Sequence, residues 1–204
     1  MIKNLIFDFG GVLLPISEAK TRKALKELGA KKSLEEDREL FNQYEKGEIT
    51  SKEFETGIQL HLFRKVFLDD IDQAWNGLID SKISPEIIEL LKGKKDKYRI
   101  FLLSNTNELH IKAIKDSSGI FLYSNFLRQF EKTYLSYEIG MRKPDAEIFE
   151  KVLKDNELEA DETFYIDDSE QHILSAEKLG IHTWHFNPEE DDINDLDKVL
   201  SKLH

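Results

Sequence analysis

The chain of 204 residues contains no cysteine and no apolar stretch long enough to span a membrane. The absence of thiols excludes disulfide bonds, thiolate zinc sites and cysteine nucleophiles. Near the N-terminus, Asp8 interrupts the apolar run before it reaches the length of a signal-peptide core. We therefore expect a cytoplasmic protein with no membrane partner.

Basic charge is also scarce, because 29 Lys and Arg residues stand against 40 Asp and Glu residues, which gives a formal net charge of -11. Such a surface repels the phosphates of DNA and RNA. The locally basic stretch at residues 94–97 is typical of a solvated turn between two elements. We expect no nucleic-acid partner, and a monomer or weak homo-oligomer with one core and a smaller appended domain.

The chain does contain three short continuous apolar runs, at Leu5–Phe7, Ile100–Leu103 and Phe164–Ile166. None of them alternates with the period of two of a half-exposed strand, so they are predicted to be strands that are covered on both faces. Helical patterns lie between the runs. This order predicts an α/β fold with a Rossmann-like parallel sheet.

Capping residues and glycines predict where several helices begin and end. Ser84 and Pro85 are predicted to begin a helix that Gly93 ends. Two further helices are predicted over residues 145–154 and 170–179, each with apolar residues on one face. The predicted sheet-bearing core comprises residues 1–16 and 87–204.

Residues 17–86 contain no run typical of a buried strand, and they are predicted to form an all-helical cap domain inserted after the first strand. Capping boxes that begin at Ser33 and Thr50 predict two helix starts, and Asp70 is predicted to cap a third helix. Phe63, Phe67 and Trp75 are the aromatic residues of this segment expected in its core, with a substrate platform as the alternative role for Trp75.

Polar residues follow each predicted strand at the point where the strand ends. Asp8 ends the first strand, Ser104 and Asn105 follow the second, and Asp167 and Asp168 end the last. A cation, Lys143, lies in a loop that leads into a helix. Ligands of open parallel sheets bind at the carboxyl ends of the strands, so we expect these side chains to converge at one edge.

The residue types at this edge suit a small-molecule phosphate ester as substrate. A carboxylate such as Asp8 can attack phosphorus and form an aspartyl-phosphate. Mg²⁺ must then separate the anions, with Asp8 and Asp168 as direct ligands and Asp167 acting through water. Ser104 can hydrogen-bond the phosphoryl oxygens, and Lys143 can neutralise them.

Each of these features alone has a simpler interpretation. An Asp followed by Gly10 and Gly11 is a common turn, and Asp-Asp before a helix is commonly a helix cap with solvated charge. The order of the features along the chain, each at or just after a predicted strand end, favours the catalytic interpretation.

The set Asp8-Phe9-Gly10-Gly11-Val12, Ser104-Asn105, Lys143-Pro144 and Asp167-Asp168-Ser169 resembles the four signature motifs of the haloacid dehalogenase (HAD) superfamily. Residues 45–49, 103–110 and 140–146 resemble a bacterial subgroup that contains an α-D-glucose-1-phosphate phosphatase. The resemblance implies that Asp8 is the nucleophile and a metal ligand, and that the Gly10 carbonyl is a further ligand. It also implies that Ser104 and Asn105 bind phosphate, that Asp168 ligates the metal with Asp167 behind it, and that Lys143 closes the site.

Two positions depart from the pattern of that superfamily. Most of its phosphatases carry a second Asp, a general acid and base, two residues after the nucleophile, where this chain has Gly10. General acid catalysis is worth roughly 10²- to 10⁴-fold, so we hypothesise a preference for acidic leaving groups such as those of sugar 1-phosphates. The other departure is His172, where the family often has Asn.

Three other functions remain alternatives. A haloacid dehalogenase would use Asp8 to displace halide without a metal, and the pair Asp167 and Asp168 argues against it because of their mutual repulsion. A phosphosugar mutase needs the acid that Gly10 replaces. A non-catalytic binding protein on the same fold has no physical need for an intact set of charged groups.

Overall fold

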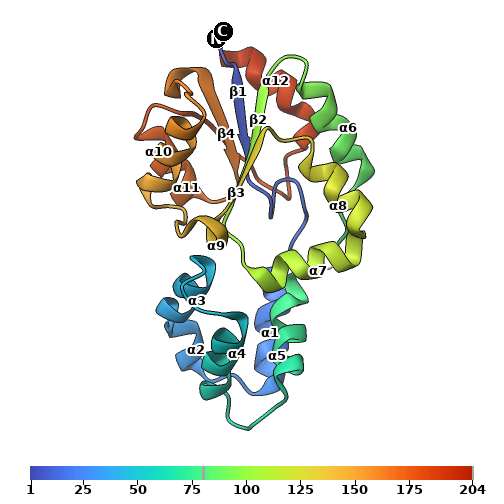
Figure 1. The fold of residues 1–204 in the computed structure, drawn as a ribbon, viewed down its shortest axis with the longest axis vertical. Helices are drawn as coiled ribbons and strands as arrows, with labels where there is room; N and C mark the ends of the chain where they lie inside the picture. Colours follow the sequence, from blue (N-terminus) through green and yellow to red (C-terminus); the bar gives the residue numbers. More distant parts are fainter. Residues whose placement is uncertain (80, 204) are drawn as a thin grey trace.

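The computed structural model describes residues 1–79 and 81–203, so positions 80 and 204 of the predicted cap and core lie outside the described residues. Its centre is a parallel sheet in the order β3-β2-β1-β4-β5 (Figure 1). The strands are β1 (Asn4–Phe7), β2 (Arg99–Ser104), β3 (Lys132–Leu135), β4 (Thr163–Asp167) and β5 (His182–His185). This sheet confirms the α/β prediction, although β3 carries too few apolar residues to be recognised in the sequence.

The register of the sheet brings the polar strand ends to one level. Phe7 of β1 lies opposite Leu102 of β2 and Ile166 of β4. The next residue, Asp8, donates its backbone N–H to the Ile166 carbonyl at 2.9 Å. Asp8 and Asp167 are therefore level on neighbouring strands.

Helices cover both faces of the sheet, because alternate residues of each apolar run point to opposite sides. Leu5 and Phe7 pack in one hydrophobic cluster with α6 (Pro85–Lys94), α7 (Glu108–Ser118), α8 (Ile120–Leu127) and α12 (Leu196–Leu200). Ile6 packs in a second cluster with α10 (Ala146–Asp155) and α11 (Glu170–Glu177) on the other face (Figure 1). The remaining short elements of this part are α9 (Ser136–Ile139), η2 (Ala160–Glu162), η3 (Ile193–Asp195) and η4 (Ser201–Leu203).

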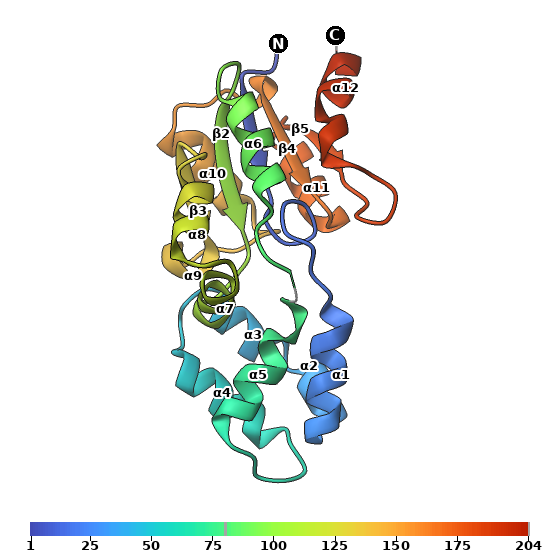
Figure 2. The same ribbon diagram turned by 90° about the vertical axis from the view of Figure 1, so that its right-hand side faces the viewer.

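A second group of helices lies beyond the carboxyl ends of the strands, as Figure 2 shows. Its members are α1 (Glu18–Leu28), α2 (Lys32–Glu36), α3 (Arg38–Glu45), α4 (Ser51–Leu60), α5 (Leu68–Trp75) and η1 (Asn76–Leu78). These helices share their own hydrophobic cluster, which includes Leu25, Tyr44, Phe54 and Ile71. The helical group therefore lies over the end of the sheet where the polar residues converge, at the carboxyl ends of the strands.

Several predicted helix boundaries are wrong. The capping box at Thr50 is present, but α2 begins after Lys31, and the Ser33 hydroxyl within it hydrogen-bonds His61 Nδ1 at 2.9 Å. Asp70 lies inside the first turn of α5, where an acidic residue stabilises the helix dipole without capping it. Gly93 also lies inside its helix, because the Lys95 N–H continues the bonding pattern to Leu91.

Two aromatic residues lie on the surface of the helical group against expectation. Phe63 and Phe67 are 79% and 82% exposed, since they belong to the loop between α4 and α5 and not to a packed helix face. Trp75 does pack in the cluster, where it stacks against Phe41 and His110.

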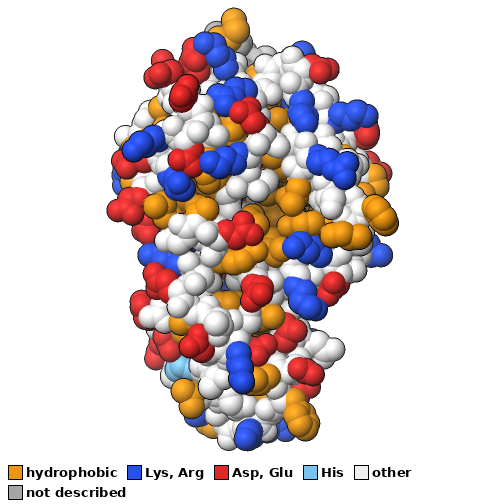
Figure 3. All heavy atoms as spheres, in the orientation of Figure 1, with side chains coloured by type: hydrophobic (Ala, Val, Ile, Leu, Met, Phe, Trp, Pro, Cys, Tyr) orange, Lys and Arg blue, Asp and Glu red, His pale blue; other side chains and the backbone are white. Residues whose placement is uncertain are grey.

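Charge and apolar length also bear on the expected partners. Acidic and basic side chains are interspersed over the face of the molecule drawn in Figure 3. Within residues 1–79 and 81–203, no helix has both the length and the apolar character needed to cross a bilayer.

Candidate active site

Lys143 is the centre of the polar cluster at the sheet edge. Its side chain is fully buried, and Nζ lies 2.8 Å from Asp8 Oδ1 and 2.6 Å from Asp167 Oδ2. Nζ also donates to the Leu103 carbonyl at 3.1 Å, which accounts for its three N–H donors. Burial opposes the charge on Lys143, but the two carboxylates outweigh it and raise the pKa of the amine.

Four donors surround the Asp167 carboxylate. They offset the free-energy cost of burying its charge. Its Oδ2 accepts from Lys143 and from the Tyr165 hydroxyl. Its Oδ1 accepts the Ser169 N–H at 2.7 Å and lies 2.9 Å from His172 Nδ1. Burial alone raises the pKa of Asp167, and the Lys143 and His172 contacts reverse this and lower it. The side chain is ionised and fully engaged by the protein.

Three carboxylates converge beside Lys143. Asp8, Asp167 and Asp168 each place one oxygen within 4.8 Å of the others, which is a spacing that can hold a metal ion. Burial raises the pKa of Asp8 and that of Asp168, and the charge of Asp167 adds to both shifts. Such a group of acids is stabilised by a bound cation, and carboxylate oxygens are the ligands that Mg²⁺ prefers.

The loop after β1 is shaped around Asp168. Gly11 has a φ of +81°, and a Cβ atom there would lie 2.1 Å from Asp168 Oδ2. A side chain at this position would therefore displace the carboxylate. The Asp168 backbone carbonyl lies 3.1 Å from His185 Nε2, so β5 contacts the segment that follows β4.

Asn105 and Ser104 lie at the end of β2 as expected, but the Asn105 side chain contacts the backbone of Lys143. Its Nδ2 donates to the Lys143 carbonyl and its Oδ1 accepts the Lys143 N–H, both at 2.9 Å. Ser104 is buried, with its hydroxyl 3.4 Å from the Asn105 carbonyl. The resemblance implied that Asn105 binds phosphate, whereas in the structure its side chain holds the backbone of Lys143.

Gly10 stands at the position where superfamily phosphatases commonly carry an acid. A Cβ atom on Gly10 would lie 2.9 Å from Ile16 Cδ1, so the end of the Ile16 side chain would have to shift to admit a side chain here. The structure agrees with the sequence that no side-chain proton donor stands two residues after Asp8.

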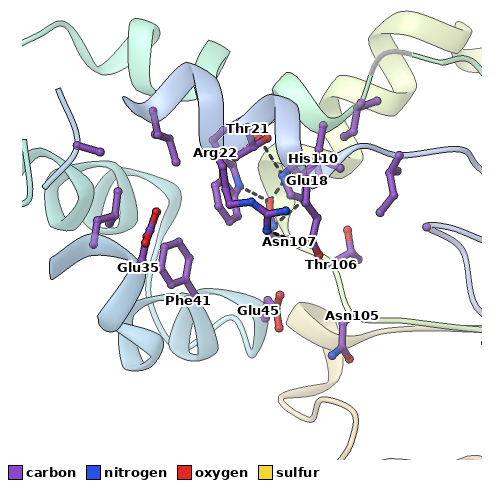
Figure 4. Close-up of a pocket in the computed structure, with 18 of the residues that line it drawn as sticks. Glu18, Thr21, Arg22, Glu35, Phe41, Glu45, Asn105, Thr106, Asn107 and His110 are labelled. Carbon is purple, nitrogen blue, oxygen red and sulfur yellow. Dashed lines mark hydrogen bonds and ion pairs between the residues drawn. The ribbon is translucent and has the colours of Figure 1, made fainter. Parts of the chain in front are cut away.

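A cavity of about 800 Å³ extends from the sheet edge into the helical group. Its wall on the sheet side includes Gly10 and residues 104–107, and α1 and α3 form the opposite walls (Figure 4). A volume of this size is typical of small-molecule sites. The cavity adjoins the charged cluster through Ser104 and Gly10.

The residues predicted to converge lie at one edge of the sheet, namely Asp8, Ser104, Lys143 and the Asp167-Asp168 pair. Tyr165 was not predicted to belong to the site, although residues two apart on a strand share a face and Tyr165 precedes Asp167 by two. His185 was not predicted either, because its contact depends on β5 lying beside β4.

The fold and site define a class of α/β hydrolase with a carboxylate cluster under a helical cover. The family model of haloacid dehalogenase-like hydrolases matches residues 2–180, and the chain belongs to this family. It is 31% identical to the D-ribitol-5-phosphate phosphatase of Bacteroides thetaiotaomicron over 195 residues, which cover 93% of each chain.

Solved structures agree with this assignment. A HAD family enzyme from Bacteroides thetaiotaomicron, solved as a magnesium complex, is 38% identical with a TM-score of 0.85, and 97% of this chain and 98% of that chain are covered. A HAD-like hydrolase from Porphyromonas gingivalis is 31% identical with a TM-score of 0.84, and 98% of each chain is covered. A 2-haloacid dehalogenase from Pseudomonas syringae, at 18% identity and a TM-score of 0.59, shares the fold over 100% of both chains.

Proposed function

We propose that this protein is a Mg²⁺-dependent phosphatase that hydrolyses a small phosphorylated sugar or sugar alcohol through an aspartyl-phosphate on Asp8. The observation that carries the proposal is the group of three carboxylates around a fully buried Lys143, next to Gly10 and Ser104, which line a cavity. The proposed metal site comprises Asp8, the Gly10 carbonyl and Asp168, with Asp167 behind them. Mg²⁺ bound there would neutralise charge between substrate and carboxylates and polarise the phosphoryl group.

The residues of the chain divide the chemistry between them. Lys143 holds Asp8 Oδ1 at 2.8 Å, so Oδ2 is the oxygen proposed to attack phosphorus. The bond from phosphorus to the ester oxygen breaks, and the departing alcohol takes its proton from solvent because Gly10 supplies none. Water then attacks the phosphorus of the aspartyl-phosphate, which releases phosphate and restores Asp8. Ser104 and the Asn105 backbone are proposed to bind the phosphoryl oxygens.

Residues 17–86 are proposed to be a cap domain whose closure excludes water from this chemistry. Its α3–α4 turn contacts the sheet-bearing part closely. Glu45 Oε2 lies 2.8 Å from Arg142 Nε, and Ser51 donates to Glu108 at 2.6 Å. A Cβ atom on Gly47 would lie 2.2 Å from the Tyr137 carbonyl, so the turn can approach only as glycine.

The proposed substrate class rests on two arguments. The 31% identity to a D-ribitol-5-phosphate phosphatase supports a phosphate ester of a polyol. The missing acid at Gly10 supports leaving groups that depart readily, such as the anomeric oxygen of a sugar 1-phosphate. In both substrates a neutral polyhydroxylated body carries one anionic phosphate group.

The experiment that tests this function is phosphate release from D-ribitol 5-phosphate, α-D-glucose 1-phosphate and an alkyl phosphate, with Mg²⁺ and with EDTA. We expect release that requires Mg²⁺ and that Asp8→Asn abolishes. Faster release from the sugar 1-phosphate than from the alkyl ester would support the leaving-group argument. Release of halide from 2-haloacids, with no phosphate release from any ester, would contradict the proposal and favour the dehalogenase alternative.

A further inference from the structure

The cavity carries acidic side chains on two opposite walls, away from the carboxylate cluster beside Lys143. Glu18 lies on α1 and Glu45 at the end of α3, and both line the cavity together with Asn105 and Thr106 (Figure 4). Nothing in the phosphoryl chemistry proposed above uses either carboxylate. Their position in the cavity indicates contact with the part of the substrate that is not phosphate.

Each carboxylate is held by an arginine. Glu45 Oε2 lies 2.8 Å from Arg142 Nε, and the Glu45 side chain is only 25% exposed. Glu18 Oε2 lies 2.9 Å from Arg22 on the next turn of α1, in a more exposed pair. An arginine partner fixes the orientation of each carboxylate and offsets its charge, and each carboxylate still has acceptor positions for further donors.

We propose that Glu45, assisted by Glu18, selects the substrate by accepting hydrogen bonds from the hydroxyl groups of a neutral polyol body. This proposal rests on the phosphatase function and names the residues that recognise its leaving group. A carboxylate accepts two hydroxyls at once, which suits neighbouring hydroxyls of a sugar or sugar alcohol. An ester without hydroxyls would cover the half-buried Glu45 carboxylate without donating to it, and such sites discriminate strongly against the apolar analogue.

Glu45 is expected to contribute more than Glu18. It is less exposed, and its partner Arg142 directly precedes Lys143 in the chain. A hydrogen bond in a partly buried site is screened less by water than one at the open edge of α1. The order of effects, Glu45 before Glu18, is part of the proposal.

The test compares D-ribitol 5-phosphate with n-pentyl phosphate, which has a carbon chain of equal length and no hydroxyls. Glu45→Gln is expected to lower kcat/KM for the polyol ester roughly 10- to 100-fold, the range of one charge-assisted hydrogen bond. Its effect on n-pentyl phosphate should stay within about twofold, since that ester forms no such bond. Glu18→Gln should act in the same direction and less strongly. Glu48→Gln, an exposed change on the same turn as Glu45, is the control and should alter neither value.

Other outcomes overturn the proposal in recognisable ways. An equal fall for both esters would mean that Glu45 acts through Arg142 and Lys143 rather than on hydroxyls. Unchanged kcat/KM values for both esters in both variants would mean that neither carboxylate touches the polyol. Hydrolysis of α-D-glucose 1-phosphate but of neither alkyl ester would contradict this proposal and leave the phosphatase function standing, and hydrolysis of none of the three esters would contradict the phosphatase function as well. Calorimetric binding of D-ribitol 5-phosphate to Asp8→Asn, with and without Glu45→Gln, gives the same comparison without turnover.

Discussion

The side-chain amide of Asn105 binds the backbone of Lys143 on both sides, donating to its carbonyl and accepting its N–H at 2.9 Å each. The end of β2 is thereby joined to the loop that carries the buried cation. Asn105 therefore fixes the backbone of the residue whose amine contacts Asp8 at 2.8 Å and Asp167 at 2.6 Å.

Asn105→Ala is expected to lower kcat by at least about tenfold, because small displacements of catalytic groups cost that much or more. KM should change less, since Ser104 and the cavity walls are retained. The measurement is steady-state phosphate release at saturating Mg²⁺. Asn125→Ala, an exposed change on α8, is the control, and an unchanged kcat in Asn105→Ala would show that the loop holds Lys143 without it.

Lys143→Met tests how far the buried cation stabilises the fold. Removing it leaves Asp8 and Asp167 facing each other, and breaking a buried ion pair typically costs about 3–5 kcal/mol. Urea unfolding in EDTA should show a fall in the free energy of unfolding within this range. Lys151→Met, which breaks a half-buried ion pair with Asp155 on the same helix, is the control and should lower the free energy of unfolding by less than about 1 kcal/mol.

A second substitution separates this electrostatic cause from lost packing. Adding Asp8→Asn to Lys143→Met removes one of the two unpaired carboxylates and should recover part of the stability. If the double variant is no more stable than Lys143→Met alone, the loss does not arise from repulsion between the carboxylates.

The sheet was predictable from sequence because its inner strands are continuous apolar runs that need cover on both faces. Phe7 and Ile166 are fully buried, and each is followed by an acid that ends the strand. The edge strand β3 was not predictable, since its burial comes from neighbours far away in the chain. Helix ends such as that at Gly93 depend on bonding geometry that glycine only weakly biases.

The site was predictable as a set of residues and less so as a set of contacts. Strand ends bring Asp8, Ser104 and Asp168 together because parallel strands end at one edge. The engagement of Asn105 with Lys143, and the approach of Glu45 to the cavity, depend on how loops and helices pack. No local pattern in the sequence carries that information.

His110 provides a test of pH dependence away from the carboxylates. Its burial beside Trp75 and Asn107 lowers its pKa to about 4, against 6.5 for a free histidine. The folded protein therefore binds this proton less readily than the unfolded chain. The stability from the neutral ring is fully present above about pH 6.5 and is lost as the pH falls toward 4.

Unfolding measured between pH 7.5 and 4.5 should show the protein losing roughly 3 kcal/mol at most through this residue, at about 1.36 kcal/mol for each pKa unit. Titrating carboxylates contribute to the same curve, so the comparison is with His110→Gln, which lacks the proton site. The difference in free energy of unfolding between the unaltered protein and His110→Gln should become smaller as the pH falls. Parallel curves would contradict the lowered pKa of His110.

Gly11→Ala is expected to damage activity and stability together. The residue has a φ of +81°, which costs a side chain about 1–2 kcal/mol, and the added Cβ would lie 2.1 Å from Asp168 Oδ2. Gly119→Ala is the matched control, because it has a φ of +82° and nothing within 4 Å of the added atom. Both variants should unfold at lower urea concentration, and only Gly11→Ala should need more Mg²⁺ for half-maximal activity. Equal Mg²⁺ requirements in the two variants would mean that the close approach of Gly11 to Asp168 does not shape the metal site.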